Sequence, residues 1–334
     1  MHLAPIETLP PELLHPIFTL SGLNLSLPKS SPILAHKLSS VHIYNTVCTH
    51  YLTQSLDDIP RAHITAAQTV IFASKWMTWD FFKQWIMQKF GDREDEKKGC
   101  LCGKTVETGC FDAQWPPNFN DATTMLYTRS HLPAFAWTKG RVPVKLLHDW
   151  DTGKLQFLRF LLWTTGMTVD WANPEVRRVA LEGKKEAILA GNLEVVELYN
   201  HNRRLGKAPG MDMVRFAVME GGCNRSIVFD TMATARDWGI REEAWNDDAL
   251  DNWCEERIQK GDPKGPWLKK KLAELRMPLD EPPINVDGKK VRVGEMHPKT
   301  GDYEAEGDML VVHTHRWNQV SRVPFRRCGR TRGW

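Results

Sequence analysis

The stretch that decides the fold runs Ala187-Ile-Leu-Ala-Gly-Asn-Leu-Glu-Val-Val-Glu-Leu198. The glycine at position 191 marks a turn, because glycine adopts backbone conformations that end helices. After it, apolar residues from Leu193 to Leu198 recur at the spacing of a helix face. Before it, Ala187 and Ala190 are small enough to let one helix lie close against its neighbour. The stretch therefore predicts a helix, a tight turn and a second helix.

Similar stretches occur elsewhere in the chain. Gly153 is also followed two positions later by a leucine and then by an apolar helix stripe. A weaker copy surrounds Gly221, and a marginal fourth copy surrounds Gly261. The steps from Gly153 to Gly191 and from Gly191 to Gly221 are 38 and 30 residues. Because steps of about 20–50 residues are typical of stacked repeats, we predict repeated helix pairs over residues 142–280.

The stretch Ala187–Leu198 resembles the second half of an ankyrin repeat, which reads Ala-x-x-x-Gly-His-Leu-Glu-Val-Val-x-Leu-Leu. The observed steps bracket the ankyrin period of about 33 residues. The Thr-Pro-Leu-His turn of well-formed ankyrin repeats is absent from the sequence, which implies degenerate repeats with missing or rebuilt hairpins. The resemblance implies a stack of helix pairs that binds a client protein. The alternative is a non-repetitive helical bundle in which the glycine turns coincide with this spacing.

A second informative stretch lies near the N-terminus and reads Glu7-Thr-Leu-Pro-Pro-Glu-Leu-Leu-His-Pro-Ile-Phe-Thr-Leu20. Leu9-Pro10 places a proline in the first turn of a helix, where its missing N–H has no helical partner to lose. The apolar residues that follow recur at three- and four-residue spacing and form one helix stripe. Such a stripe packs on the chain's own core or on another protein. Its members are Leu13, Leu14, Ile17 and Phe18.

This arrangement resembles the opening of an F-box, the small helical module by which substrate receptors of cullin-type ubiquitin ligases bind a Skp-type adaptor. The resemblance covers about residues 5–50. Their second half, from Leu27 to Tyr44, looks like a variant common in fungal F-box-like proteins and lacks the tryptophan of other F-boxes. The residues that the resemblance assigns to adaptor binding are Leu9, Pro10, Glu12, Leu13, Leu14, Ile17 and Phe18.

Composition indicates a globular protein. The chain has 334 residues, of which 42% are hydrophobic and 25% charged, so it can form a packed core. A net charge of +3 is too small to indicate nucleic acid as the main partner. Seven irregularly spaced cysteines do not form a secreted disulfide framework, and no apolar run approaches the roughly 20 residues of a membrane helix. We therefore expect an intracellular protein, cytoplasmic or nuclear, without membrane contact.

The remaining segments complete a predicted organisation in five parts. A charge run at 91–98 and a turn-rich stretch at 115–119 indicate an exposed insertion. Strand-like patterns at 289–293 and 309–312 predict a small hairpin, which a basic tail follows. The predicted fold is mainly α, with an F-box-like helical module at 1–55, connecting helices at 56–90, the insertion at 91–141, degenerate ankyrin-like helix-pair repeats at 142–280, and a β-hairpin with the basic tail at 281–334.

Three short patterns suggest catalytic or metal chemistry, and we discount each. A phosphate-binding loop at 98–105 would need a glycine where Lys98 stands, after a buried strand rather than a charge run. The cysteines at 100, 102 and 110 lack the two-residue gap and the fourth ligand of a zinc site, and the histidines at 313 and 315 lack a third ligand. The sequence thus predicts no catalytic residue, metal or cofactor.

Three functions remain open at this stage. The first is a non-enzymatic substrate-recruiting adaptor of a cullin-type ubiquitin ligase, which the two resemblances imply. The second is an ankyrin-like protein-interaction scaffold without a ubiquitin role, in which the N-terminal module only caps the repeats. These two differ in whether Leu13, Ile17 and Phe18 are exposed or buried. The third is an enzyme with a pocket among His131, His148, Asp149 and Asp151.

Overall fold

A computed structural model describes residues 4–53, 60–90, 116, 118–120 and 138–277, together with the backbone of 284–286 and 289–291. The described chain is mainly helical, which confirms the predicted fold class at that level. No described helix has the length and apolar character needed to span a bilayer. The chain divides into two compact units, the first from the described parts of Met1–Leu146 with Asp151–Asp170, and the second from Leu147–Trp150 with the described parts of Trp171–Arg327.

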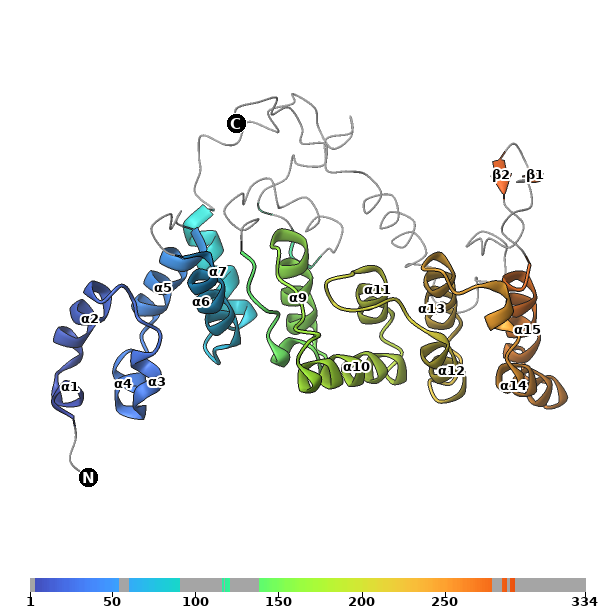
Figure 1. Ribbon diagram of the computed structural model, residues 1–334, viewed down its shortest axis with the longest axis horizontal. Helices are drawn as coiled ribbons and strands as arrows, with labels where there is room; N and C mark the ends of the chain where they lie inside the picture. Colours follow the sequence, from blue (N-terminus) through green and yellow to red (C-terminus); the bar gives the residue numbers. More distant parts are fainter. Residues whose placement is uncertain are drawn as a thin grey trace. The chain divides into compact units, whose positions relative to one another are not determined.

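The first unit is built from short helices at its N-terminal end and longer ones after them (Figure 1). Several begin with proline at the first or second position, where the missing N–H has no helical partner. The helices are α1 (Pro5–Thr8), α2 (Pro11–Leu20), α3 (Leu27–Ser30), α4 (Pro32–Lys37), α5 (Val41–Thr53), α6 (Arg61–Ala73), α7 (Trp79–Phe90), the 3-10 turn η4 (Val144–Leu146) and α9 (Thr152–Thr164).

An aromatic core joins α6, α7 and α9 inside the first unit. The rings of Phe82 and Phe157 lie 5.1 Å apart, and the Trp79 and Phe157 rings stack at 5.4 Å. The indole N–H of Trp79 donates to Gln156 Oε1 at 2.7 Å, so this buried polar group is satisfied. Helix α7, which lies within the connecting helices predicted at 56–90, is therefore a core helix.

The described residues of the predicted insertion 91–141 are partly exposed and partly packed. Pro116, Asn118, Asn120, Lys139 and Arg141 are exposed. Phe119 lies against the Trp79 ring at 5.5 Å, and Thr138 is buried. The backbone N–H of Lys139 donates to Gln68 Oε1 at 3.1 Å. The segment is therefore packed at Phe119 and Thr138, and the exposed insertion as a whole stays a prediction. The rest of that segment lies outside the described residues.

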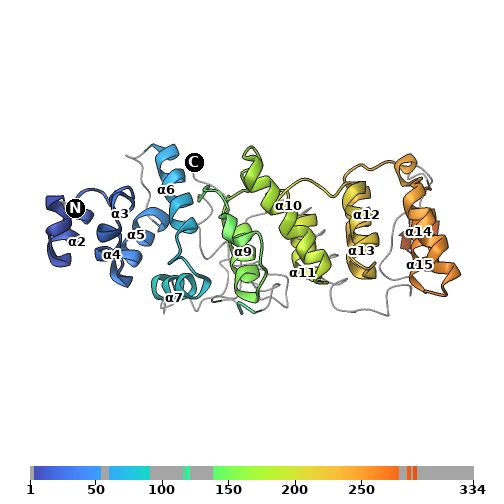
Figure 2. The same ribbon diagram turned by 90° about the horizontal axis from the view of Figure 1, so that it is seen from below.

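The second unit contains three successive helix pairs (Figure 2). The first helices of neighbouring pairs contact each other, α10 with α12 and α12 with α14, and the second helix α11 contacts α13. The pairs are α10 (Pro174–Leu189) with α11 (Leu193–His201), α12 (Met211–Met219) with α13 (Arg225–Asp237), and α14 (Asp248–Gln259) with α15 (Lys264–Leu275), the 3-10 turn η5 (Glu242–Trp245) preceding the third.

A glycine in the left-handed region ends the first helix of each pair. Gly191, Gly222 and Gly261 have φ between 67° and 71°, which a residue with a Cβ adopts only with strain. The next helix is then capped by a side chain: Asn192 accepts from the backbone N–H of Val195, and Asn224 caps α13 in the same way. These turns explain why the glycine spacing in the sequence predicts helix pairs.

Three details of the predicted repeats differ from the structure. Gly153 lies inside the first turn of α9, so it makes no turn between paired helices, and α9 belongs to the first unit. Gly222 rather than Gly221 takes the left-handed conformation. Gly221 is instead a close-packing position, where an added Cβ would lie 2.6 Å from Ile188 Cγ2. The predicted boundary at residue 142 also falls inside the first unit.

The described strands form one short ladder. β1 (Ile284–Val286) pairs antiparallel with β2 (Lys289–Val291), with Ile284 opposite Val291. β2 overlaps the predicted strand at 289–293. It pairs with β1, which precedes it in the chain, whereas the predicted partner at 309–312 follows it. The other predicted strand, at 309–312, lies outside the described residues, so the predicted hairpin stays a prediction.

Candidate partner-docking surface

Helix α2 has clear start and stop signals. The carbonyl oxygen of Pro10 accepts from the backbone N–H groups of Leu13 and Leu14, both at 3.1 Å, so the helix starts directly after the Leu-Pro pair. At its end the N–H of Leu23 donates to Phe18 O at 3.1 Å and Gly22, with φ of 74°, reverses the chain. The stretch Pro11–Leu20 thus forms one ten-residue helix with defined ends.

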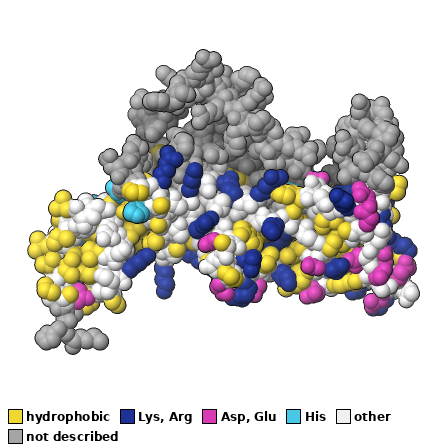
Figure 3. Space-filling view, in the orientation of Figure 1, with side chains coloured by type: hydrophobic (Ala, Val, Ile, Leu, Met, Phe, Trp, Pro, Cys, Tyr) yellow, Lys and Arg dark blue, Asp and Glu magenta, His cyan; other side chains and the backbone are white. Residues whose placement is uncertain are grey.

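The two faces of α2 have opposite surroundings. Leu14 and Phe18 are 0% and 1% exposed and lie in the core of the first unit. Leu13, Ile17 and Leu20 are 55%, 40% and 87% exposed, and their i, i+4, i+7 spacing puts them on one stripe. We call these three residues the docking stripe. The part of the surface that carries α1 to α4 is rich in apolar side chains and has few charged ones (Figure 3).

The structure thereby divides the seven residues that the sequence assigns to partner binding. Pro10, Glu12, Leu13 and Ile17 are exposed, and Leu9 is partly exposed. Leu14 and Phe18 are core residues, so the rest of the unit covers only one side of the apolar stripe at 13, 14, 17 and 18. Leu20 and Val41, which is 64% exposed at the start of α5, are exposed apolar residues that the sequence analysis did not assign. The helical spacing of Leu20 from Leu13 and Ile17 could have assigned Leu20 to the same stripe from the sequence.

Lys37 fixes the start of α2. Its ammonium group donates to the carbonyl oxygens of Glu7 at 2.6 Å and Leu9 at 2.7 Å, and its own carbonyl oxygen contacts His15 Nε2 at 3.0 Å. A hydrogen bond from Ser31 and one from the Ala4 N–H lower the pKa of the exposed Glu7 carboxyl. These contacts tie α1 and the beginning of α2 to α4.

A hollow of about 410 Å³ lies at the C-terminal end of α2. The phenol O–H of Tyr51 donates to the carbonyl oxygens of Gly22 and Leu23, both at 3.2 Å, and so holds the turn that borders it. The wall of the hollow combines apolar and neutral polar side chains. Such a wall suits a side chain of a protein partner better than a charged cofactor. It is lined by Thr19, Gly22, Leu23, Asn45, Thr46, Thr49 and His50.

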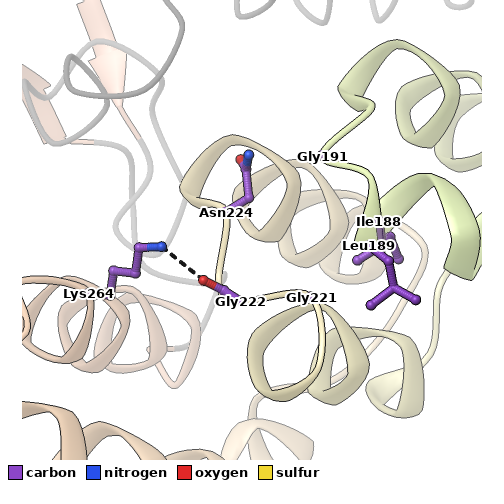
Figure 4. A pocket seen from close by; sticks show the side chains of 7 residues that line it. All are labelled: Ile188, Leu189, Gly191, Gly221, Gly222, Asn224 and Lys264. Carbon is purple, nitrogen blue, oxygen red and sulfur yellow. Dashed lines mark hydrogen bonds between the residues drawn. The ribbon is translucent and has the colours of Figure 1, made fainter.

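A second hollow, of about 250 Å³, lies in the second unit beside the turns of two helix pairs (Figure 4). Its floor is Ile188, and Lys264 at its rim donates to Gly222 O at 2.9 Å. In Figure 4 the Asn224 side chain does not point toward Lys264, so the polar groups do not converge on one point. The hollow therefore has no arrangement typical of a small-molecule site. Leu189, Gly191 and Gly221 complete its lining.

The residues of the possible enzyme pocket have other roles where they are described. His148 Nδ1 and Asp149 Oδ2 are 2.6 Å apart at the surface of the second unit. Asp151 caps α9 in the first unit by accepting from the Lys154 N–H at 2.8 Å. His131 lies outside the described residues, as do the cysteines at 100, 102 and 110 and the histidines at 313 and 315. Among the residues that the structure describes, no three His, Cys, Asp or Glu side chains are grouped to hold a metal ion.

The candidate site that the described residues offer is thus the exposed apolar face of α2. Comparison with protein-family models, with curated proteins and with solved structures finds no match to this chain.

Proposed function

We propose that the protein is a substrate-recruiting adaptor of a cullin-type ubiquitin ligase. In this proposal the docking stripe on α2 binds a Skp-type adaptor, and the helix pairs of the second unit bind a client protein. The chain itself performs no chemistry. It raises the effective concentration of the client's lysine side chains near the enzyme that transfers ubiquitin.

The observation that carries the proposal is the exposure of the docking stripe. Two of the three discriminating residues, Leu13 and Ile17, are exposed in the isolated chain, whereas a module that only capped the repeats would bury them. Full burial of one large aliphatic side chain contributes about 1.5–3 kcal/mol, so three neighbouring ones give a partner a strong reason to bind. Leu14 and Phe18 support this role indirectly, because their burial in the core holds α2 in place.

The helix pairs support a client-binding role for the second unit. Glycine turns and asparagine caps recur in successive pairs, and first helices contact first helices, as in stacked repeats. We infer that the pairs are degenerate ankyrin-like repeats, of which α10–α11 contains the closest sequence match. Their loops and outer faces are then the surface that a client contacts.

Binding of the full chain to a purified fungal Skp-type adaptor tests the proposal. We expect the wild type to co-elute with the adaptor in size-exclusion chromatography. The double variant Leu13→Asp, Ile17→Asp should lose at least about a hundredfold in affinity, because it places charges in an apolar interface. The matched control is Leu181→Asp, Leu189→Asp, which charges two exposed leucines of α10 and should leave binding unchanged.

Two results would refute the adaptor role. One is a wild-type chain that does not bind the adaptor although both proteins are folded by circular dichroism. The other is a docking-stripe variant that binds as tightly as the control variant. Either result would leave the protein-interaction scaffold as the remaining proposal.

A further inference from the structure

A buried polar network connects three helices of the second unit. The ammonium group of Lys184 on α10 donates to Asn200 Oδ1 on α11 at 2.6 Å. The Asn200 amide donates in turn to Asp230 Oδ2 on α13 at 2.7 Å. The other carboxylate oxygen, Asp230 Oδ1, lies 2.6 Å from His201 Nε2 on α11. The network thus joins the first helix pair to the second helix of the next pair.

The network is isolated from water. The side chains of His201 and Asp230 are 11% and 4% exposed, and Lys184 and Asn200 are buried. Since a carboxylate oxygen can only accept, Nε2 of His201 carries the hydrogen of this contact. The imidazole therefore becomes charged when its other nitrogen, Nδ1, takes up a proton. The hydroxyl of Thr234 on α13 lies 3.5 Å from Nε2.

Charged groups from two neighbouring helices face His201. On α13 these are Asp230 and the more distant Asp237, and on α10 it is Lys184. A protonated His201 gives the buried carboxylate a direct ionic partner, whereas a neutral His201 leaves only a neutral hydrogen bond in its place. An ion pair with good geometry is worth more inside a protein than in water, and a buried charge that loses its partner destabilises the fold.

We propose that the His201–Asp230 contact is a proton-controlled latch between α11 and α13. With His201 protonated, the latch is closed and the first helix pair is held firmly on the next. With His201 neutral, the contact opens more readily, and the packing of the helix pairs loosens. The regulating ligand is a proton, and the latch does not depend on the proposed adaptor role.

The direction of the effect follows from the surroundings of His201. Burial by itself lowers the pKa of the imidazole, but the charge and hydrogen bond of Asp230, with Asp237, outweigh it, so the pKa is raised above 6.5. A raised pKa means that the folded state binds this proton more tightly than the unfolded state. Its contribution to stability is complete below pH 6.5 and is lost as pH rises through the folded-state pKa.

Hydrogen–deuterium exchange of the full chain tests the latch. We expect the α11 and α13 amides, corrected for intrinsic exchange, to be better protected at pH 6 than at pH 8. The equilibrium constant for local opening of α11 and α13 should change by up to about tenfold for each pKa unit by which the pKa of His201 in the folded state exceeds its pKa in the open state. The variant His201→Gln, whose amide can still donate to Asp230, should lose this dependence. The control His36→Gln, at an exposed histidine, should retain it.

A measurement on the wild type covers the case in which the His201 variant does not fold. An NMR titration of the histidine rings should show that the pKa of His201 lies above 6.5. The latch is refuted if the pKa of His201 is 6.5 or lower. It is equally refuted if folded His201→Gln keeps the wild-type pH dependence of α11 and α13 exchange.

Discussion

The ammonium group of Lys37 donates to the carbonyl oxygen of Leu9 at 2.7 Å, across 28 residues of chain. Leu9 is the last residue before the proline at which α2 is capped, so this contact fixes where the docking helix starts. The second acceptor, Glu7 O, belongs to α1. One lysine side chain therefore holds the two N-terminal helices on α4, and the orientation of the docking stripe depends on a residue outside it.

The variant Lys37→Met should weaken the N-terminal helices. It keeps the length of the side chain but removes two charge-assisted hydrogen bonds, which are worth about 1.5–3 kcal/mol each at most. We expect faster proteolysis of α1 and α2 and weaker binding of the Skp-type adaptor, both measured on the full chain. Lys29→Met, at an exposed lysine of α3, is the control and should change neither.

Truncation of the two faces of α2 should have different effects on stability. Phe18→Ala removes a ring from the core and should lower the free energy of unfolding by about 3–5 kcal/mol. Leu13→Ala changes an exposed side chain and should stay within about 0.5 kcal/mol. Urea unfolding measures both. Equal effects would mean that Leu13 is packed as well, which would contradict an open docking stripe.

Gly183→Ala should destabilise the second unit although alanine favours helices. A Cβ at position 183 would lie 1.7 Å from the carbonyl oxygen of Leu147, and backbone cannot move aside as a flexible side chain can. The Trp150 indole also donates to Gly183 O at 2.8 Å, which fixes the two segments together. We expect a loss of about 1–3 kcal/mol in thermal or urea unfolding. The change Gly210→Ala meets no atom within 4 Å and affects only the N-cap of α12, so it should cost less, about 0.5–1 kcal/mol.

Lys184 makes the stability of the second unit depend on pH in the alkaline range, and the sign of this effect is opposite to that of His201. Burial lowers the pKa of Lys184 to about 8, from 10.5 in the unfolded chain, although the charge of Asp230 partly opposes this shift. Between these values the unfolded state binds the proton and the folded state does not, so this group makes stability rise with pH. Between pH 8 and pH 10 the unfolding free energy of the wild type should therefore rise relative to that of Lys184→Met. Lys207→Met, at an exposed lysine, should show no such change.

Helix content and turn positions follow largely from local sequence. Glycine needs no neighbour to adopt φ near 70°, and an asparagine after it caps the next helix with its own side chain, so the pairs at Gly191 and Gly222 are visible in the chain. For the α10–α11 pair, the sequence predicts the turn at Gly191 and the helix stripe that follows it, but not the start of α10 at Pro174. By contrast, Arg61–Ala73 is predicted only as part of the connecting helices at 56–90, without bounds of its own, because it lacks a capping side chain and a strong apolar stripe. It is helical because its apolar residues pack into the aromatic core.

The division of α2 into two faces could not be read from its sequence. Leu13 and Leu14 are chemically identical neighbours, and periodicity alone gives one broad apolar stripe. Which of the two is buried depends on the segments that pack against α2, among them α4, where the carbonyl oxygen of Lys37 contacts His15 Nε2. The buried network in the second unit was missed for the same reason, since Lys184, Asn200 and Asp230 lie far apart in the chain and carry no common motif.

Local sequence accounts for the mainly helical fold, for the start of α2 and for the turns of the helix pairs, because prolines, glycines and asparagines act on the backbone beside them. Packing between distant segments sets which apolar residues of α2 stay exposed and which charged residues meet in the interior. Exposure and ion pairing are properties of three-dimensional packing between segments distant in sequence, and no local pattern encodes them.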